Sequence, residues 1–373
     1  MIISLVTQID NKEIVLPAIQ RDFVWDEDRI TKMFDSIMRG YPLGIVLLWE
    51  TYLDIKYRDF EENYQNESRY LYKDNISSKR IKLVLDGQQR LQSLFIALSG
   101  SLDGKELFFD VLSGSKGDDF REVFYIFRFL KNKDVKSLNS TTKEFKERNV
   151  GEQENGNGEQ EKYPIFVSVK EILNFNPEGR LNLKNSLKKD FFLSDDEVIR
   201  LELNINRIIH SLTNDPNVLK ISTIDENKPK DSKDRKSESD ILEAFVRINR
   251  QGIALSRSDL IFSMLKLNWK ESADELPDFI KEINNGNNLG IDVDFVIRSL
   301  FAVSDLGSKF DVDLLRKHSN VAKVKDNYER TCNSIRSLVD FMQDECGILN
   351  SGILGSYLNL IPIVYYLANT PDS

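Results

Sequence analysis

The sequence has few of the side chains from which disulfide frameworks and transition-metal sites are built. Among 373 residues there are two cysteines and two histidines. Cys332 and Cys346 can form neither a disulfide framework nor a four-cysteine zinc site, so we expect thiols in a reducing compartment. His210 and His318 belong to no HExxH, HxH or HNH-like cluster. A histidine-rich metallonuclease centre therefore cannot be built from them.

The sequence also lacks a positive net charge and long apolar segments. Fifty-one Lys and Arg against sixty Asp and Glu give a net charge of −9. This argues against a protein that coats nucleic acid through many phosphate contacts, although it leaves room for a local basic pocket. No apolar stretch is long enough to span a bilayer, and the N-terminus has no signal-peptide pattern. We expect a cytoplasmic protein with no membrane partner.

The sequence contains enough apolar residues to form a large hydrophobic core. Hydrophobic residues make up 40% of the sequence, aromatic residues 10% and charged residues 30%, well above the level of disordered chains. We predict an α/β (α+β) domain over residues 1–235 and a mostly helical domain over 240–373. The helical domain is expected to continue into a C-terminal effector region. Residues 131–162 are so polar that we predict a mobile surface insertion there, and residues 225–240 are expected to form a solvated loop.

The first hundred residues alternate between strand and helix patterns. An extended segment at Val15–Ile19 precedes an amphipathic helix that Asp26 caps and that Gly40 and Pro42 end. Buried strands follow at 44–49 and 81–85, the second leading directly into a helix over 91–98. Further strands are expected at 107–111, 124–129 and 165–169. After residue 240 the periodicity is helical, with helices expected at 241–248, 260–267, 275–284, 292–304, 320–343 and 352–367.

The five residues Asp86-Gly87-Gln88-Gln89-Arg90 form the strongest candidate site, because they join a buried strand to a helix. Gly87 permits a tight turn, and the N-terminus of the following helix favours an anion. Arg90 adds a forked cation suited to phosphate oxygens, and Asp86 could hold Mg²⁺ or orient a water molecule. The two glutamines could position that water. An ordinary turn followed by a surface arginine explains the same residues equally well.

Two other polar segments could join this site. Gln20-Arg21 ends an extended apolar segment and suits a phosphate or base contact. Asn249 begins the segment Asn-Arg-Gln-Gly, which an ordinary helix C-terminal turn also explains unless it folds back onto the other two.

Three blocks of the sequence together resemble a known family. They are LPAIQRDFVWDEDRITKMFDSIMRGYPLG, LVLDGQQRLQSL and FVRINRQGIALSRSDLIFSML. These blocks are similar to those of the N-terminal domain family of GmrSD-type modification-dependent restriction enzymes, which includes SspE- and BrxU-like proteins. The resemblance extends to about residue 270 and implies a ParB/sulfiredoxin-like fold. Ile19 departs from it, since many members have an aromatic residue at that position.

The resemblance implies a module of an anti-phage restriction system that binds and hydrolyses a nucleoside triphosphate, GTP or another, with Mg²⁺. Catalysis would then fall to Asp86, Gln89 and Arg90, with Asp86 also the metal ligand. Nucleotide binding would involve the remaining matched positions: Gln20, Arg21, Gly87, Gln88 and Asn249. The module would gate a nuclease domain or subunit located elsewhere. Modified DNA and a second copy of the chain are further candidate partners.

Two alternatives to this function stay open. The chain could be a ParB-like module in which the nucleotide sets conformation with little hydrolysis, or a domain that itself nicks DNA. We expect no DNA cleavage by this chain alone, because the usual histidine-based ligand sets are absent. We also expect that replacing Arg90 with Ala leaves the fold intact, because an exposed arginine contributes little to packing.

Overall fold

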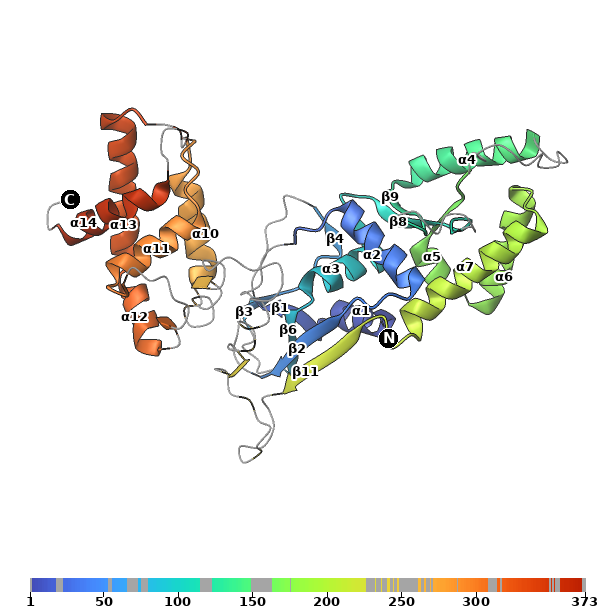
Figure 1. The fold of residues 1–373 in the computed structure, drawn as a ribbon, viewed down its shortest axis with the longest axis horizontal. Coiled ribbons are helices and arrows are strands. Elements are labelled where there is room, and N and C mark those ends of the chain that lie inside the picture. The colour runs from blue at the N-terminus through green and yellow to red at the C-terminus, as the bar shows by residue number, and fades with distance from the viewer. Residues whose placement is uncertain are drawn as a thin grey trace.

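The structure, a computed structural model, describes residues 2–17, 23–52, 56–65, 73–74, 80–114, 123–148, 163–174, 176–225 and, with interruptions, 232–370. It is a mixed α+β fold followed by a helical C-terminal region, as the sequence predicts. Helices α10 to α14 lie at one end of the molecule and the strands at its centre (Figure 1). None of the described helices is long and apolar enough to cross a membrane.

The central sheet has six strands in the order β11-β2-β6-β1-β3-β5. Strand β6 lies between β2, to which it is antiparallel, and β1, to which it is parallel. Strand β11 runs parallel to β2 at one edge, and β3 and β5 form the other edge. The bounds are β1 Ile14–Pro17, β2 Ile45–Thr51, β3 Lys56–Arg58, β5 Lys73–Asp74, β6 Ile81–Asp86 and β11 Lys220–Asp225.

The middle strands of this sheet are covered on both faces. In β6, Val84 packs into one hydrophobic core, whereas Leu83 and Leu85 pack into another. Because successive side chains of a strand point to opposite faces, this alternation means that both faces are buried. The first core contains helices α1 (Ile2–Asp10), α2 (Glu27–Arg39) and α3 (Gln88–Leu98). The second contains apolar side chains of the C-terminal region. A near-continuous apolar run such as Ile81–Leu85 is typical of a strand buried in this way.

Helix α2 begins and ends where the sequence predicts. The Asp26 carboxylate accepts a hydrogen bond from the backbone N–H of Arg29, which caps the first turn. Gly40 ends the helix in the left-handed region with φ 76°. Its N–H bonds to Ile37, and the N–H of Tyr41 bonds to the carbonyl of Ser36, so the last turn is closed in the usual way for a glycine end.

Helix α3 differs from an ordinary surface helix because it is buried on all sides. Ten of its eleven residues are buried, the exception being Arg90, which is partly exposed. The buried residues include Gln88, Gln89, Gln92 and Ser93. Buried polar side chains usually have hydrogen-bond partners, and the glutamine amides of α3 bond to the segments around it.

A second, three-stranded sheet has the order β10-β8-β9, with bounds β8 Glu106–Asp110, β9 Phe127–Leu130 and β10 Phe166–Ser168. These three strands fall where the sequence predicts them. A short parallel pair, β4 (Asn63–Tyr64) and β7 (Ser101–Leu102), lies at the end of α3.

The first half of the segment 131–162, for which we predicted a mobile surface insertion, is helical. Residues Asn132–Arg148 form helix α4, and 149–162 lie outside the described residues. Four side chains at helical spacing form its inner stripe. Val135 and Leu138 pack beside the strand residues Phe108 and Phe166. Thr142 Oγ1 donates a hydrogen bond to the carbonyl of Pro164. Phe145 stacks on Tyr163. The high polar content conceals this narrow stripe, because most of the helix faces solvent.

The sequence did not predict five of the elements. They are helix α1, strand β11 at the sheet edge, and helices α5 (Val169–Asn174), α6 (Pro177–Asp190) and α7 (Asp195–Thr213). Helix α7 begins with a full capping box between Ser194 and Glu197. Its buried face carries Leu201, Ile205 and Ile208 into the core beneath the central sheet. The cap and the spacing are both visible in the sequence, so these signals could have predicted the helix.

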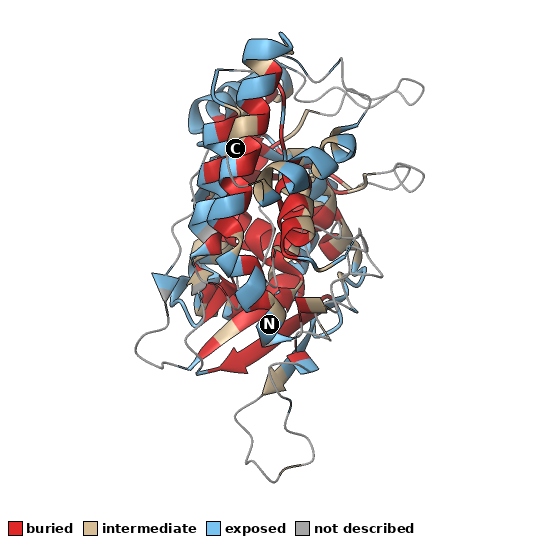
Figure 2. Cartoon of the chain, turned by 90° about the vertical axis from the view of Figure 1, so that its left-hand side faces the viewer, coloured by how far each residue is buried: buried red, intermediate tan, exposed pale blue. Residues whose placement is uncertain are grey.

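The C-terminal helices follow the predicted periodicity, with two corrections. The bounds are α10 Ser272–Ile283, α11 Val293–Val303, α12 His318–Asp326, α13 Tyr328–Asp340 and α14 Ile361–Asn369. The single helix expected over 320–343 is broken at Asn327, whose side chain bonds back to the carbonyl of Lys323. The helix expected over 352–367 begins only at Ile361, because Pro362 fits the first turn of a helix but not its interior. Buried and exposed residues alternate along the helices (Figure 2), as in amphipathic helices packed around a core.

Both cysteines are free thiols, as predicted. Burial raises the pKa of the Cys332 thiol to about 12, so it remains protonated and inert at neutral pH.

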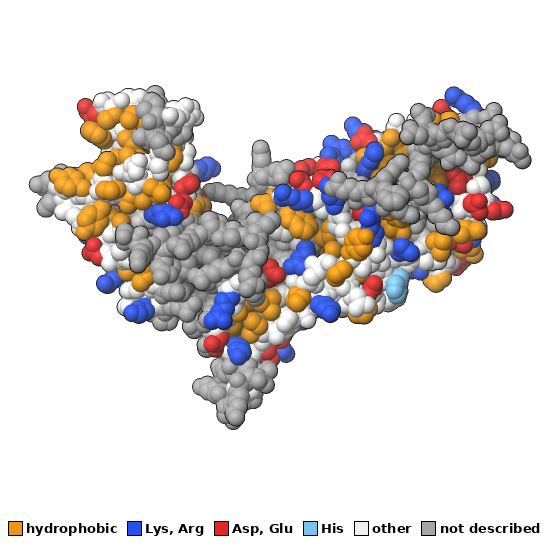
Figure 3. Space-filling view, viewed as in Figure 1, with side chains coloured by type: hydrophobic (Ala, Val, Ile, Leu, Met, Phe, Trp, Pro, Cys, Tyr) orange, Lys and Arg blue, Asp and Glu red, His pale blue; other side chains and the backbone are white. Residues whose placement is uncertain are grey.

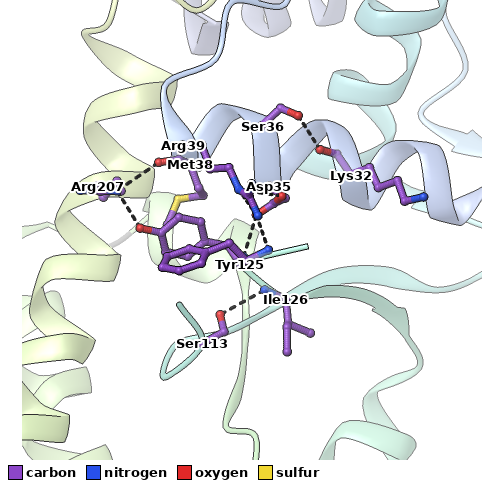
Figure 4. Close-up of polar contacts among 10 residues, drawn as sticks. Lys32, Asp35, Ser36, Met38, Arg39, Ser113, Tyr125, Ile126 and Arg207 are labelled. Atoms are coloured by element: carbon purple, nitrogen blue, oxygen red, sulfur yellow. Dashed lines mark hydrogen bonds and ion pairs between the residues drawn. The ribbon is translucent and has the colours of Figure 1, made fainter. Parts of the chain in front are cut away.

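A buried carboxylate joins α2 to the segment that leads into β9. Asp35, only 5% exposed, accepts hydrogen bonds from the backbone N–H groups of Phe124 and Tyr125 at 3.1 and 2.6 Å. Its other oxygen lies 3.1 Å from Nε of Arg39. Arg207 of α7 completes the junction by donating to the hydroxyl of Tyr125 at 2.7 Å. Figure 4 shows these side chains converging from α2, α7 and the segment before β9.

We predict that Asp35→Ala lowers the free energy of unfolding by about 2–4 kcal/mol, because two buried N–H groups and Arg39 lose a charged acceptor. Urea unfolding followed by circular dichroism measures the change. Asp28→Ala on the same helix is the control, since Asp28 is an exposed partner of Lys32 and should cost less than about 1 kcal/mol. Equal losses for the two variants would contradict a structural role for Asp35.

Candidate functional site at the turn between β6 and α3

The predicted Asp86–Arg90 segment lies at the end of the central strand β6 and at the start of the buried helix α3. Gly87 has φ 91° and precedes the helix, a conformation that glycine adopts at little cost. A Cβ atom at this position would lie 2.9 Å from Cγ2 of Val46 in the neighbouring strand. The turn therefore needs glycine for both its backbone angle and its close approach to β2. The residue at the N-cap of α3 is Gly87, which has no side chain to cap the helix.

The register between β2 and β6 changes next to the turn. Leu48 is opposite Val84, whereas Leu47 is opposite Asp86, so Leu85 is an extra residue in β6. Bulges of this kind often lie beside active sites, because they redirect a side chain at the end of a strand. Here the bulge immediately precedes Asp86.

Arg90 is held by three partners around the turn. Its Nη1 donates to the carbonyl of Leu43 at 2.5 Å, and its Nη2 donates to the carbonyl of Ile45 at 2.9 Å. The same Nη2 lies 3.2 Å from Oδ2 of Asp86. The side chain of Arg90 is only 18% exposed. The guanidinium therefore ties the loop before β2 to the turn after β6.

A second glycine makes room for this guanidinium. Gly44 lies between the two carbonyls that Arg90 binds and has φ 92°. A Cβ atom there would lie 2.9 Å from Nη1 of Arg90, and a Cβ atom at Gly87 would lie 3.3 Å from Nη2. Arg90 is thus enclosed by two glycines from two of the sequence blocks, YPLG and DGQQR. We did not predict a role for Gly44, although its place at the end of a conspicuous block was a usable signal.

Two glutamines of α3 bind further segments of backbone. Oε1 of Gln89 accepts a hydrogen bond from the N–H of Val24 at 2.9 Å. Gln92 accepts from the N–H of Glu61 at 3.2 Å and donates to the same residue's carbonyl at 2.6 Å. Gln88 is buried. The amide groups of α3 therefore bind backbone in two segments that lie on either side of β2 in the sequence.

Asp86 is the more exposed member of the motif's ion pair. Its side chain is 41% exposed, and Oδ2 contacts Nη2 of Arg90. A carboxylate with one arginine contact has oxygen lone pairs left for another cation or for water. Across the described residues no three His, Cys, Asp or Glu side chains are grouped so that they could hold a metal ion. Among the described residues, Asp86 therefore belongs to no preformed cluster of three such ligands.

The other predicted binding residues, Gln20, Arg21 and Asn249, lie outside the described residues, and their convergence with Asp86–Arg90 stays a prediction. One contact bears on the first pair. Val24, which Gln89 binds, follows Arg21 by three residues. The backbone of the first block is therefore attached to the second block three residues after the Gln-Arg pair.

One expectation about an individual side chain needs correction. Arg90 is not an exposed arginine with little effect on packing, because its guanidinium binds two backbone carbonyls and Asp86. Gln89 has its Oε1 bonded to the N–H of Val24, and its role in positioning water stays a prediction. Sequence alone could not identify these contacts, since the carbonyls and the N–H group lie far along the chain.

Charges of both signs are mixed over the described surface in the view of Figure 3. This agrees with the near balance of acidic and basic residues in the sequence. The described part of the face shown is not a continuous basic surface of the kind that binds nucleic acid without sequence preference.

We predict that Gly44→Ala destabilises the protein by about 1–3 kcal/mol, because the new Cβ atom meets a guanidinium that three partners hold in place. Gly40→Ala is the matched control: Gly40 also has positive φ, but a Cβ atom there meets nothing within 4 Å. Urea unfolding of both variants separates the shared backbone strain from the contact with Arg90. If Gly44→Ala lowered the free energy of unfolding no more than Gly40→Ala does, the guanidinium of Arg90 would be free to move away from the new Cβ atom, and its tight enclosure would be contradicted.

Two comparisons with known proteins bear on this arrangement. Residues 2–266 match the family described as GmrSD restriction endonuclease, N-terminal domain. An uncharacterized protein of Methanocaldococcus jannaschii is 33% identical over 97 residues, which cover 26% of this chain and 16% of that protein. The chain thus aligns with about one sixth of the length of this relative. The matched family region includes the whole central sheet and the turn that Arg90 holds, and the chain belongs to the family of GmrSD restriction endonuclease N-terminal domains.

Proposed function

We propose that the chain is the nucleotide-binding and nucleotide-hydrolysing regulatory module of a restriction system. The observation that carries the proposal is the Asp86 side chain, 41% exposed at the end of a buried strand and immediately before the N-terminus of α3. Phosphate groups favour such helix ends because backbone N–H groups and the helix dipole face them. The membership of the family supports the restriction system as the setting.

The donor set at this turn fits Mg²⁺ only together with a nucleotide. Mg²⁺ commonly takes one or two carboxylates from the protein and completes its shell with phosphate oxygens and water. Asp86 supplies one carboxylate, and its contact with Nη2 of Arg90 fixes its direction. When bound, the ion would neutralise phosphate charge. Asp86 is accordingly the residue to which we assign the metal.

The remaining residues of the motif act in two ways under this proposal. Gly87 and Gln88 bring the start of α3 toward the phosphates. Arg90 and Gln89 are positioning residues in the described structure, because they bind the backbone of Leu43, Ile45 and Val24. We assign Gln20, Arg21 and Asn249 to the nucleotide as well, on the family resemblance alone.

The partners of the module follow from the same proposal. A nuclease domain or subunit would be gated by the nucleotide state, and modified DNA would be the signal. GTP is one candidate nucleotide, beside ATP, CTP and UTP. A second copy of the chain is a further candidate partner.

A second candidate function is a module that binds nucleotide with little hydrolysis. The engagement of Arg90 and Gln89 by backbone favours it, because catalysis of phosphoryl transfer usually needs cations and polar groups aimed at the reacting phosphate. Release of phosphate in single-turnover conditions separates the two functions.

We predict release of inorganic phosphate from at least one of ATP, GTP, CTP or UTP in the presence of Mg²⁺. Asp86→Asn should lower the rate about 100-fold or more, since the metal loses its carboxylate ligand. The measurement is a phosphate-release assay with each nucleotide in turn.

Asp190→Asn serves as the control, because Asp190 is an exposed acid at the end of α6, and it should hydrolyse at the parental rate. Turnover by Asp86→Asn at the parental rate would remove Asp86 from the mechanism. Tight nucleotide binding without turnover by the parental chain would favour the second function.

A further inference from the structure

The loop between α2 and β2 carries an exposed aromatic ring that the site described so far does not use. Tyr41 is 53% exposed, and its place in the loop is well defined. Its N–H bonds to the carbonyl of Ser36 at 2.9 Å, Gly40 precedes it in the left-handed region, and Pro42 follows it. The hydrogen bonds that close α2 hold the backbone before the ring, and Pro42 restricts the backbone after it, so this ring is not on a freely moving surface loop.

The ring is also supported from within the protein. The guanidinium of Arg39 lies 5.9 Å from the centre of the Tyr41 ring and 5.5 Å from that of Phe124. Arg39 itself is fixed by Asp35, whose carboxylate is 3.1 Å from Nε. Phe124 contributes its N–H to the same carboxylate. Phe124, Arg39 and Tyr41 therefore form a cation–aromatic cluster whose exposed member is Tyr41.

The same loop is attached to the Asp86–Arg90 turn. Leu43, two residues after Tyr41, gives its carbonyl to Arg90, and Ile45 does the same. The N–H of Leu43 bonds to the carbonyl of Val218, which holds the loop from its other side. The chain can extend only about 3.3–3.6 Å per residue, so the Cα of Tyr41 lies within roughly 7 Å of that of Leu43.

The hydrogen bonds and the ion pair described for the turn involve no aromatic side chain. Arg90 and Gln89 contact Leu43, Ile45 and Val24 through backbone atoms, and their own groups are a guanidinium and an amide. A nucleotide has a planar base that is stabilised by stacking on an aromatic ring, and this stacking depends little on which base is present. Tyr41 is an exposed aromatic ring on the loop that Arg90 holds.

We propose that the exposed ring of Tyr41 is the surface on which the base of the bound nucleotide stacks. This inference rests on the proposed function, since it places the base of the same nucleotide whose phosphates meet the start of α3. Under this proposal, stacking on Tyr41 contributes to the affinity for the nucleotide, and this contribution depends little on which base is present.

The test compares a ligand that has a base with one that lacks it. Binding of the β,γ-imido analogues of ATP and GTP and of inorganic tripolyphosphate, each with Mg²⁺, is measured by calorimetry for the full chain. Tyr41→Ala should weaken both nucleotide analogues by about ten-fold or more and leave the affinity for tripolyphosphate unchanged. Tyr41→Phe should bind like the parental chain, because the ring is retained.

Tyr52→Ala is the matched control. Tyr52 is 44% exposed but follows the opposite end of β2 from Ile45, so nucleotide affinity should not change. Thermal unfolding of Tyr41→Ala within a degree or two of the parental chain shows that the fold is kept.

Three outcomes overturn the proposal. If Tyr41→Ala weakens tripolyphosphate as much as the nucleotides, or weakens neither, the base does not stack on Tyr41. If Tyr41→Ala loses only the binding of a single-stranded oligonucleotide, the ring serves DNA instead. If the parental chain binds neither nucleotide nor tripolyphosphate, the proposed function itself fails and Tyr41 loses its role with it.

Discussion

The guanidinium of Arg90 is the contact on which the arrangement at the central strand depends. It lies between Gly44 and Gly87, both with positive φ, and it binds the carbonyls on either side of Gly44. Any side chain at Gly44 would come too close to the guanidinium, and any at Gly87 would come too close to Val46. The loop before β2 and the turn after β6 are therefore built around one cation.

Helix α3 extends this principle to the segments around it. Its amides bind the backbone at Val24 and Glu61, and its guanidinium binds the backbone at Leu43 and Ile45. Buried polar groups of this kind are costly unless each is paired. Pairing them with backbone fixes where neighbouring segments lie. Asp86 and the start of α3 are thus held in place by side chains that bind neighbouring backbone.

The sequence predicted the strands and helices that form this frame but not how its polar side chains are used. The cap at Asp26, the stop at Gly40 and the apolar run before Asp86 are local signals, and each has the predicted outcome. The carbonyls that Arg90 binds and the N–H that Gln89 binds lie more than forty residues away along the chain, and no spacing rule identifies such partners. Helix α4 was missed for a different reason, because its narrow apolar stripe is hidden by a polar composition.

The central claim is that Arg90 supports the fold of the turn whereas Asp86 is left for a ligand. The most direct test is the free energy of unfolding of Arg90→Gln and Asp86→Asn, measured side by side in urea. The account predicts a loss of about 1–3 kcal/mol for Arg90→Gln, because two carbonyls and a carboxylate lose a charged donor. It predicts less than about 1 kcal/mol for Asp86→Asn, whose ion pair is partly exposed. Equal losses, or a fully stable Arg90→Gln, would contradict it.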